Sequence, residues 1–120
     1  MYKQIAHIAF TVKNMETTIG FYAKLLGTKH LFSLANPAGE PWIEYLKGID
    51  GQYIELFYGG ERARVLTDRS ICFMHVDYLV DDLDKAHANA LELGAEIVEY
   101  LPQKHLIVRD CDNNTLKLIS

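Results

Sequence analysis

The chain of 120 residues is 49% hydrophobic and 23% charged, which is enough apolar material for one packed core. Its net charge of −4, without any Lys/Arg cluster, excludes nucleic acid and anionic membrane surfaces as partners, and no apolar run reaches membrane-spanning length. Cys72 and Cys111 have no metal-site spacing and the N-terminus has no signal-peptide segment, so we expect a cytoplasmic protein with free thiols.

The first half of the chain predicts four strands and one helix. Residues 4–12 have the composition of a strand in which Ile8 and Phe10 face the core and His7 lies on the opposite face. Asn14 suits the N-cap of the helix that follows, and Gly27 suits its end. The apolar stripe expected on this helix is Met15, Ile19, Tyr22 and Leu26. Further strands are expected at residues 29–35, 42–46 and 52–58.

The second half repeats this order after a polar linker at residues 59–69. A strand at 71–80 precedes a helix that is opened by Asp81 or Asp82 and ended by Gly94. Three more strands are expected at residues 96–101, 105–109 and 115–119. We therefore expect one α+β domain over residues 1–120, built from two βαβββ modules at residues 1–58 and 70–120.

The two halves also share sequence at constant spacing. The segment 7–16 returns at 75–84, so that His7 is matched by His75. The segment 50–56 returns at 112–118, and there Glu55 is matched by Lys117. An internal repeat of this kind indicates two equivalent structural units.

Three ligand-type side chains lie at key positions of this repeat. His7, Glu55 and His75 are all on predicted strand faces that point away from the helix-covered core, so they converge if the two units pair with those faces inward. Two imidazoles and a carboxylate suit one divalent ion, Zn²⁺, Ni²⁺, Fe²⁺ or Mn²⁺, with open positions for substrate. Alternatively, Glu55 forms an ion pair with Lys117 that replaces the metal.

The walls of such a cavity would be largely aromatic. Tyr53 and Phe57 share a predicted strand face with Glu55, and aromatic walls suit an apolar ligand, although core packing also accounts for them. The candidates for substrate-lining positions are Tyr53, Phe57, Trp42, His105 and Lys117.

The sequence resembles the vicinal oxygen chelate superfamily, which includes glyoxalase I, methylmalonyl-CoA epimerase, extradiol dioxygenases and bleomycin- or fosfomycin-resistance proteins. The segments that carry the resemblance are residues 7–12, 21–27, 53–56 and 75–76, together with residues 110–114, which are similar to the family's Asp-Pro-Asp-Gly-Asn turn. The resemblance implies two modules that form a cupped, incomplete barrel around a metal, and a homodimer. It also implies metal ligands at His7, Glu55 and His75, whereas Lys117 stands where the family usually has a carboxylate.

The activity implied by the resemblance is that of a glyoxalase-I-like lyase or isomerase. It would act on a small oxygenated substrate through a metal-stabilised enediolate, with Glu55 as both ligand and candidate catalytic base. Lys117 would neutralise substrate charge or tune the site. A metal-free protein of the same fold that binds a small molecule such as an antibiotic is the alternative, and a ring-cleaving dioxygenase is a third possibility.

Overall fold

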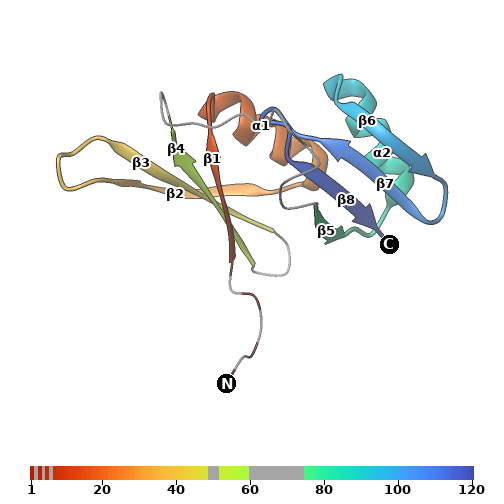
Figure 1. Ribbon diagram of the computed structural model, residues 1–120, viewed down its shortest axis with the longest axis horizontal. Coiled ribbons are helices and arrows are strands. Elements are labelled where there is room, and N and C mark those ends of the chain that lie inside the picture. Colours follow the sequence, from red (N-terminus) through yellow and green to blue (C-terminus); the bar gives the residue numbers. More distant parts are fainter. Residues whose placement is uncertain (2, 4, 6, 49–51, 60–74) are drawn as a thin grey trace. The chain divides into compact units, whose positions relative to one another are not determined.

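The computed structural model describes the chain except for residues 2, 4, 6, 49–51 and 60–74 (Figure 1). It divides into two compact units, residues 1–23 with 27–64 and residues 24–26 with 65–120. In the described part of the chain, no helix has both the length and the apolar character needed to span a membrane. Most of the expected linker at 59–69 and the beginning of the strand expected at 71–80 lie outside the described residues.

The first module has the order β-α-β-β-β, and its sheet has the strand order β1-β4-β3-β2. β1 and β4 pair in parallel although they are far apart in sequence, whereas β3 pairs antiparallel with both β4 and β2. Its elements are β1 (His7–Val12), α1 (Met15–Leu26), β2 (Lys29–Ala35), β3 (Pro41–Lys47) and β4 (Tyr53–Tyr58).

The second module repeats this topology with the strand order β5-β8-β7-β6, and here β5 and β8 are the parallel pair. Its elements are β5 (Val76–Leu79), α2 (Leu83–Leu93), β6 (Glu96–Leu101), β7 (His105–Arg109) and β8 (Thr115–Ile119). The α+β class and the two βαβββ modules are thus confirmed. That residues 1–120 form a single domain stays a prediction.

Both helices begin and end with the same local signals. The side chain of Asn14 accepts a hydrogen bond of 3.0 Å from a backbone N–H in the first turn of α1, and Asp82 does the same for α2 at 2.9 Å. Gly27 and Gly94 then end the helices in the left-handed conformation, with φ of 72° and 65°. Asp82, rather than Asp81, is therefore the N-cap of α2.

The core of the first module lies on one face of its sheet. Phe10 of β1 stacks on Tyr22 of α1, with ring centroids 6.1 Å apart, so α1 contacts the face of the sheet that carries Phe10. Leu46, Ile54 and Leu56 are buried on the same face. Because side chains alternate along a strand, the odd-numbered residues of β1 and β4 lie on the opposite face.

The buried stripe of α1 differs from the expected one. Met15 and Tyr22 are buried as predicted, but Ile19 and Leu26 are only half-buried. The other buried positions of the helix are Thr18, Phe21 and Leu25. With 3.6 residues per turn, steps of three and of four residues are both compatible with one stripe, so the sequence does not decide which positions are buried.

Candidate functional site

His7 and Glu55 are brought together by the parallel pairing of β1 and β4. In that register Ala9 lies beside Glu55 and Tyr53 beside His7, so the two ligand-type side chains are diagonal neighbours on one face. The His7 Nε2 and Glu55 Oε2 atoms are 3.3 Å apart. The imidazole is 47% exposed and the carboxylate only 13%, so the pair presents its histidine to the solvent.

Tyr45 adds a third polar group to this pair. It lies directly opposite Glu55 in the β3–β4 register. A hydrogen bond to Glu55, then burial, then the charge of Glu55 raise the pKa of the Tyr45 phenol, which therefore stays a donor to the carboxylate. Tyr45 was not predicted at this site because the offset between β3 and β4 cannot be read from the sequence of the two strands.

Aromatic side chains flank Glu55 on the same strand face. Tyr53 and Phe57 lie two residues before and after it in β4, as predicted. Trp42 of β3 contacts Phe57 edge to face, with ring centroids 6.1 Å apart and an angle of 81° between the rings. Tyr53 and Trp42 are 42% and 43% exposed, so two of these aromatic groups remain accessible to a ligand.

The second module places its acid on a different strand. His75 immediately precedes β5, and its Nε2 atom is 2.7 Å from Oδ1 of Asp77. Asp77 lies directly opposite Lys117 in the β5–β8 register, just as Ala9 lies opposite Glu55 in the first module. In each module, therefore, the histidine of the repeat is paired with a carboxylate. The carboxylate is on the fourth strand of the first module and on the first strand of the second.

His105 forms a separate pair at the hairpin between β6 and β7. Its Nε2 atom is 2.7 Å from Oε2 of Glu99. Ile107 lies opposite Lys117, so alternation along β7 places His105 on the same sheet face as Lys117. Its role in lining a substrate cavity stays a prediction.

His7 and Glu55 belong to one compact unit and His75 to the other, so a site made of all three stays a prediction, as does an ion pair between Glu55 and Lys117. In the part of the chain that the structure describes, no group of three or more His, Cys, Asp or Glu side chains is arranged to hold a metal.

The His7–Glu55 pair fits two ligands of one divalent ion. Nitrogen and oxygen ligands lie about 2.0–2.2 Å from such an ion, so two of them at tetrahedral or octahedral angles lie about 3.0–3.4 Å apart. The observed separation of 3.3 Å falls in this range. For His75 to bind a metal through Nε2, its contact with Asp77 would have to open or become shared with the ion.

The chain was compared with known families and structures. No curated protein sequence matches it significantly. Among solved structures it is similar to glyoxalase I of Leishmania major (20% identity, TM-score 0.82, covering 99% of this chain and 87% of that one). It is also similar to the fosfomycin resistance protein FosX of Mesorhizobium loti (16% identity, TM-score 0.81, 99% and 92%). A FosX variant of Listeria monocytogenes, solved with Mn(II) and 1S,2S-dihydroxypropylphosphonic acid, is a further match (18% identity, TM-score 0.78, 98% and 92%). A profile of the Glyoxalase/Bleomycin resistance protein/Dioxygenase superfamily matches residues 4–118, and the chain therefore belongs to that superfamily.

Proposed function

We propose that this protein is a metal-dependent lyase or isomerase that acts on a small oxygenated substrate. The observation that carries the proposal is the His7–Glu55 pair, which has the separation expected of two ligands of one ion and lies on the face opposite the packed core. The Mn(II) bound by the Listeria FosX structure supports a divalent ion for this fold.

His7, Glu55 and His75 are the proposed ligands, and Asp77 extends this set. In the second module Lys117 occupies the repeat position of Glu55, yet an acid is still held beside the histidine. Asp77 is therefore proposed to take the place of the carboxylate that Lys117 replaces. It would either bind the metal itself or orient the His75 ring. A bound divalent ion would act as a Lewis acid toward a substrate oxygen.

Glu55 is the proposed base, and Tyr45 its positioning residue. The carboxylate is mostly buried and sits between an imidazole and a phenol that donates to it, so its orientation is restricted. A carboxylate held in this way can take a proton from a substrate carbon or oxygen placed over the sheet face. The exposed rings of Tyr53 and Trp42 would contact the apolar part of that substrate. We further propose a homodimer, on the basis of the family resemblance, and a cytoplasmic location, on the basis of the cysteine spacing and the N-terminal sequence.

Metal-dependent thermal stability tests this proposal without knowledge of the substrate. An ion that binds only the folded state at about 100 times its Kd stabilises by about 2.7 kcal/mol. For a domain of this size, that raises the melting temperature by roughly 10 °C. We expect such a shift with Mn²⁺, Ni²⁺ or Zn²⁺ after chelator treatment. We expect its loss in His7→Ala and in His75→Ala, and a smaller shift in Asp77→Asn.

His87→Ala is the matched control, because this histidine stacks on Tyr100 rather than pairing with an acid. It should keep the full metal shift. A wild-type protein that none of these ions stabilises would contradict the proposed metal site. Loss of the shift in His7→Ala but not in His75→Ala would restrict the site to the first module.

A metal-free small-molecule binding protein is the second candidate, and Lys117 favours it. Lys117 stands where the first module has Glu55, so the second module lacks that carboxylate as a metal ligand. The ammonium group of Lys117 could instead pair with a negatively charged group of a bound small molecule. In this case bleomycin or fosfomycin would stabilise the protein in the presence of chelator, while metal ions alone would not. Calorimetric titration of both antibiotics with and without Mn²⁺ separates the two functions.

A further inference from the structure

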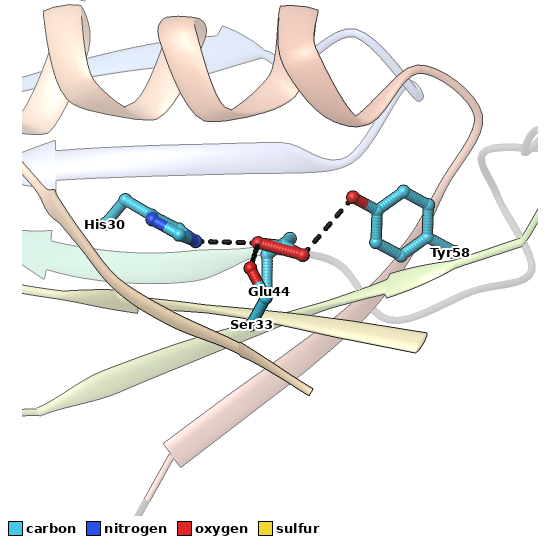
Figure 2. Close-up of polar contacts among 4 residues, drawn as sticks. All are labelled: His30, Ser33, Glu44 and Tyr58. Carbon is cyan, nitrogen blue, oxygen red and sulfur yellow. Dashed lines mark hydrogen bonds and ion pairs between the residues drawn. The ribbon is translucent and has the colours of Figure 1, made fainter. Parts of the chain in front are cut away.

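A second polar cluster lies on the other face of the first module's sheet. Glu44 of β3 is only 5% exposed although it is an acid. Its Oε1 atom is 2.7 Å from Nε2 of His30 and accepts a hydrogen bond from the hydroxyl of Ser33, and its Oε2 atom accepts one of 3.2 Å from the hydroxyl of Tyr58. Figure 2 shows His30 and Tyr58 reaching the carboxylate from opposite sides. These four residues are called the Glu44 cluster.

The Glu44 cluster is separate from the His7–Glu55 pair. Glu44 lies opposite Leu56 in the β3–β4 register, whereas Tyr45 lies opposite Glu55. Because consecutive residues of a strand face opposite sides, the two carboxylates lie on different faces of one sheet. The proposed metal site therefore does not account for Glu44.

The fold does not require an acid at this position. The register pairs Glu44 with Leu56 and Leu106 with Leu118, so residues 44 and 106 are equivalent in the two modules. Leu106 is completely buried, which shows that the same topology accepts an apolar residue there. A buried carboxylate is costly to desolvate, and replacing it by an apolar residue is often neutral or stabilising. The acid in the first module is thus better explained by binding than by stability.

A pocket of about 330 Å³ adjoins the cluster. Three members of the cluster line it, namely Ser33, Glu44 and Tyr58. Its remaining wall is mainly apolar and comes from Leu34, Ala35 and Pro41 at the end of the β2–β3 hairpin. A buried acid at one side of a small, largely apolar hollow is the arrangement expected for a ligand with one polar end.

The buried carboxylate favours a ligand that carries a positively charged donor. A carboxylate can accept about four hydrogen bonds, and the three contacts to Glu44 leave room for a further donor. Burial and then the Glu44 carboxylate raise the pKa of the Tyr58 phenol, so its hydroxyl stays protonated beside the acid.

We propose that this pocket binds a small primary alkylammonium group, with Glu44 as its charge partner and Ala35 and Pro41 against its alkyl chain. The site is independent of the proposed metal chemistry, because it lies on the other face of the sheet. Its ligand would be a free amine or the amine end of a larger metabolite.

Butylammonium chloride is the probe that we would titrate, with backbone amide NMR of the full chain as the readout. Saturable shifts of the amides of Ser33, Gly39 and Tyr58 are expected, with a Kd of roughly 1–10 mM as is usual for so small a ligand. 1-Butanol, which has the same chain without the charge, and equal concentrations of NaCl should give no saturable shifts at these amides.

Two variants and a charge-matched control make the test specific. Glu44→Gln should weaken binding by at least about tenfold, which is the effect of losing one charged hydrogen bond. Ala35→Leu should also weaken it by filling the pocket without altering the acid. Glu40→Gln removes a nearby exposed acid that does not line the pocket and should change the Kd by less than about twofold.

The proposal is overturned if butylammonium gives no saturable shift, or if butanol shifts the same amides equally. It is also overturned if folded Glu44→Gln binds as wild type does. Should Glu44→Gln fail to fold, Ala35→Leu decides, since unchanged binding in that variant places the ligand elsewhere.

Discussion

At the two equivalent positions 44 and 106, Leu106→Glu should lower the free energy of unfolding far more than Glu44→Leu does. Leu106 is completely buried, and Leu118, its cross-strand neighbour on the same face, is completely buried as well. Glu44 is buried beside polar groups that can return to water: Ser33 and Tyr58 are exposed, and the His30 side chain is 39% exposed.

In Leu106→Glu, the introduced carboxyl must either be buried as an anion or bind a proton. Protonation at pH 7 costs about 3.7 kcal/mol, because pH 7 lies about 2.7 pH units above the ordinary pKa of a glutamate. Lost leucine packing and an unsatisfied hydroxyl add about 2 kcal/mol. The total of about 6 kcal/mol is a large share of the stability of an ordinary domain.

In Glu44→Leu, the gain and the loss nearly cancel. Removing a buried acid relieves its desolvation, while the lost hydrogen bonds contribute about 0.5–1.5 kcal/mol each. His30, Ser33 and Tyr58 can all be resolvated because each is at least partly exposed. We expect a change in the free energy of unfolding within about 2 kcal/mol of zero.

Urea denaturation of both variants at pH 5 and pH 7 checks these values. The folded-state pKa of the introduced carboxyl in Leu106→Glu lies above its unfolded-state pKa. Its penalty therefore grows as the pH rises between the two values. The deficit should be smaller at pH 5 than at pH 7 by about 2.7 kcal/mol. A Leu106→Glu deficit below about 2 kcal/mol, or one smaller than that of Glu44→Leu, would refute the reasoning that the surroundings of position 106 cannot hold an acid while those of position 44 can lose one.

Three further results are expected. Asp82→Ala removes the N-cap of α2 and should lower the free energy of unfolding by about 1 kcal/mol, as should Asn14→Ala for α1; urea denaturation that finds neither effect would contradict the capping role. Burial and then the Asp110 carboxylate raise the pKa of Tyr78 well above its ordinary value, so stability present below about pH 10 is lost as the pH rises further. Tyr78→Phe should make that alkaline loss shallower in denaturant titrations at pH 9 to 11, and an unchanged slope would disprove the assignment. Glu55→Gln should lower the pKa of Tyr45, because the variant lacks the carboxylate that raises it. Difference absorbance of Glu55→Gln would detect this change, and the Glu55→Gln/Tyr45→Phe double variant identifies the signal of Tyr45.

The topology was predictable because it depends on local signals that occur twice. Asn14 and Asp82 each open a helix, and Gly27 and Gly94 each end one, at positions that the sequence marks directly. Alternation within a strand was equally direct, which is why His7 and Glu55 were expected on the face opposite the packed core. These inferences use neighbours in sequence, and tertiary packing did not override them.

The contacts that depend on strand register could not be predicted. Tyr45 reaches Glu55 only because of the offset between β3 and β4. Glu44 stands in a strand whose sequence gives no reason to expect a buried acid, since its partners come from β2 and β4. Register and long-range pairing are the features that periodicity leaves open.

The parallel pairing of β1 with β4 also affects the order in which the first module folds. β2, β3 and β4 can pair as successive antiparallel hairpins. β1 pairs with β4 only after the whole chain between them has been brought together, and closing so long a loop is slow and costs entropy. The proximity of His7 to Glu55 is then a late event in folding. A spectroscopic probe of that pair would report completion of the sheet, after the hairpins have already formed.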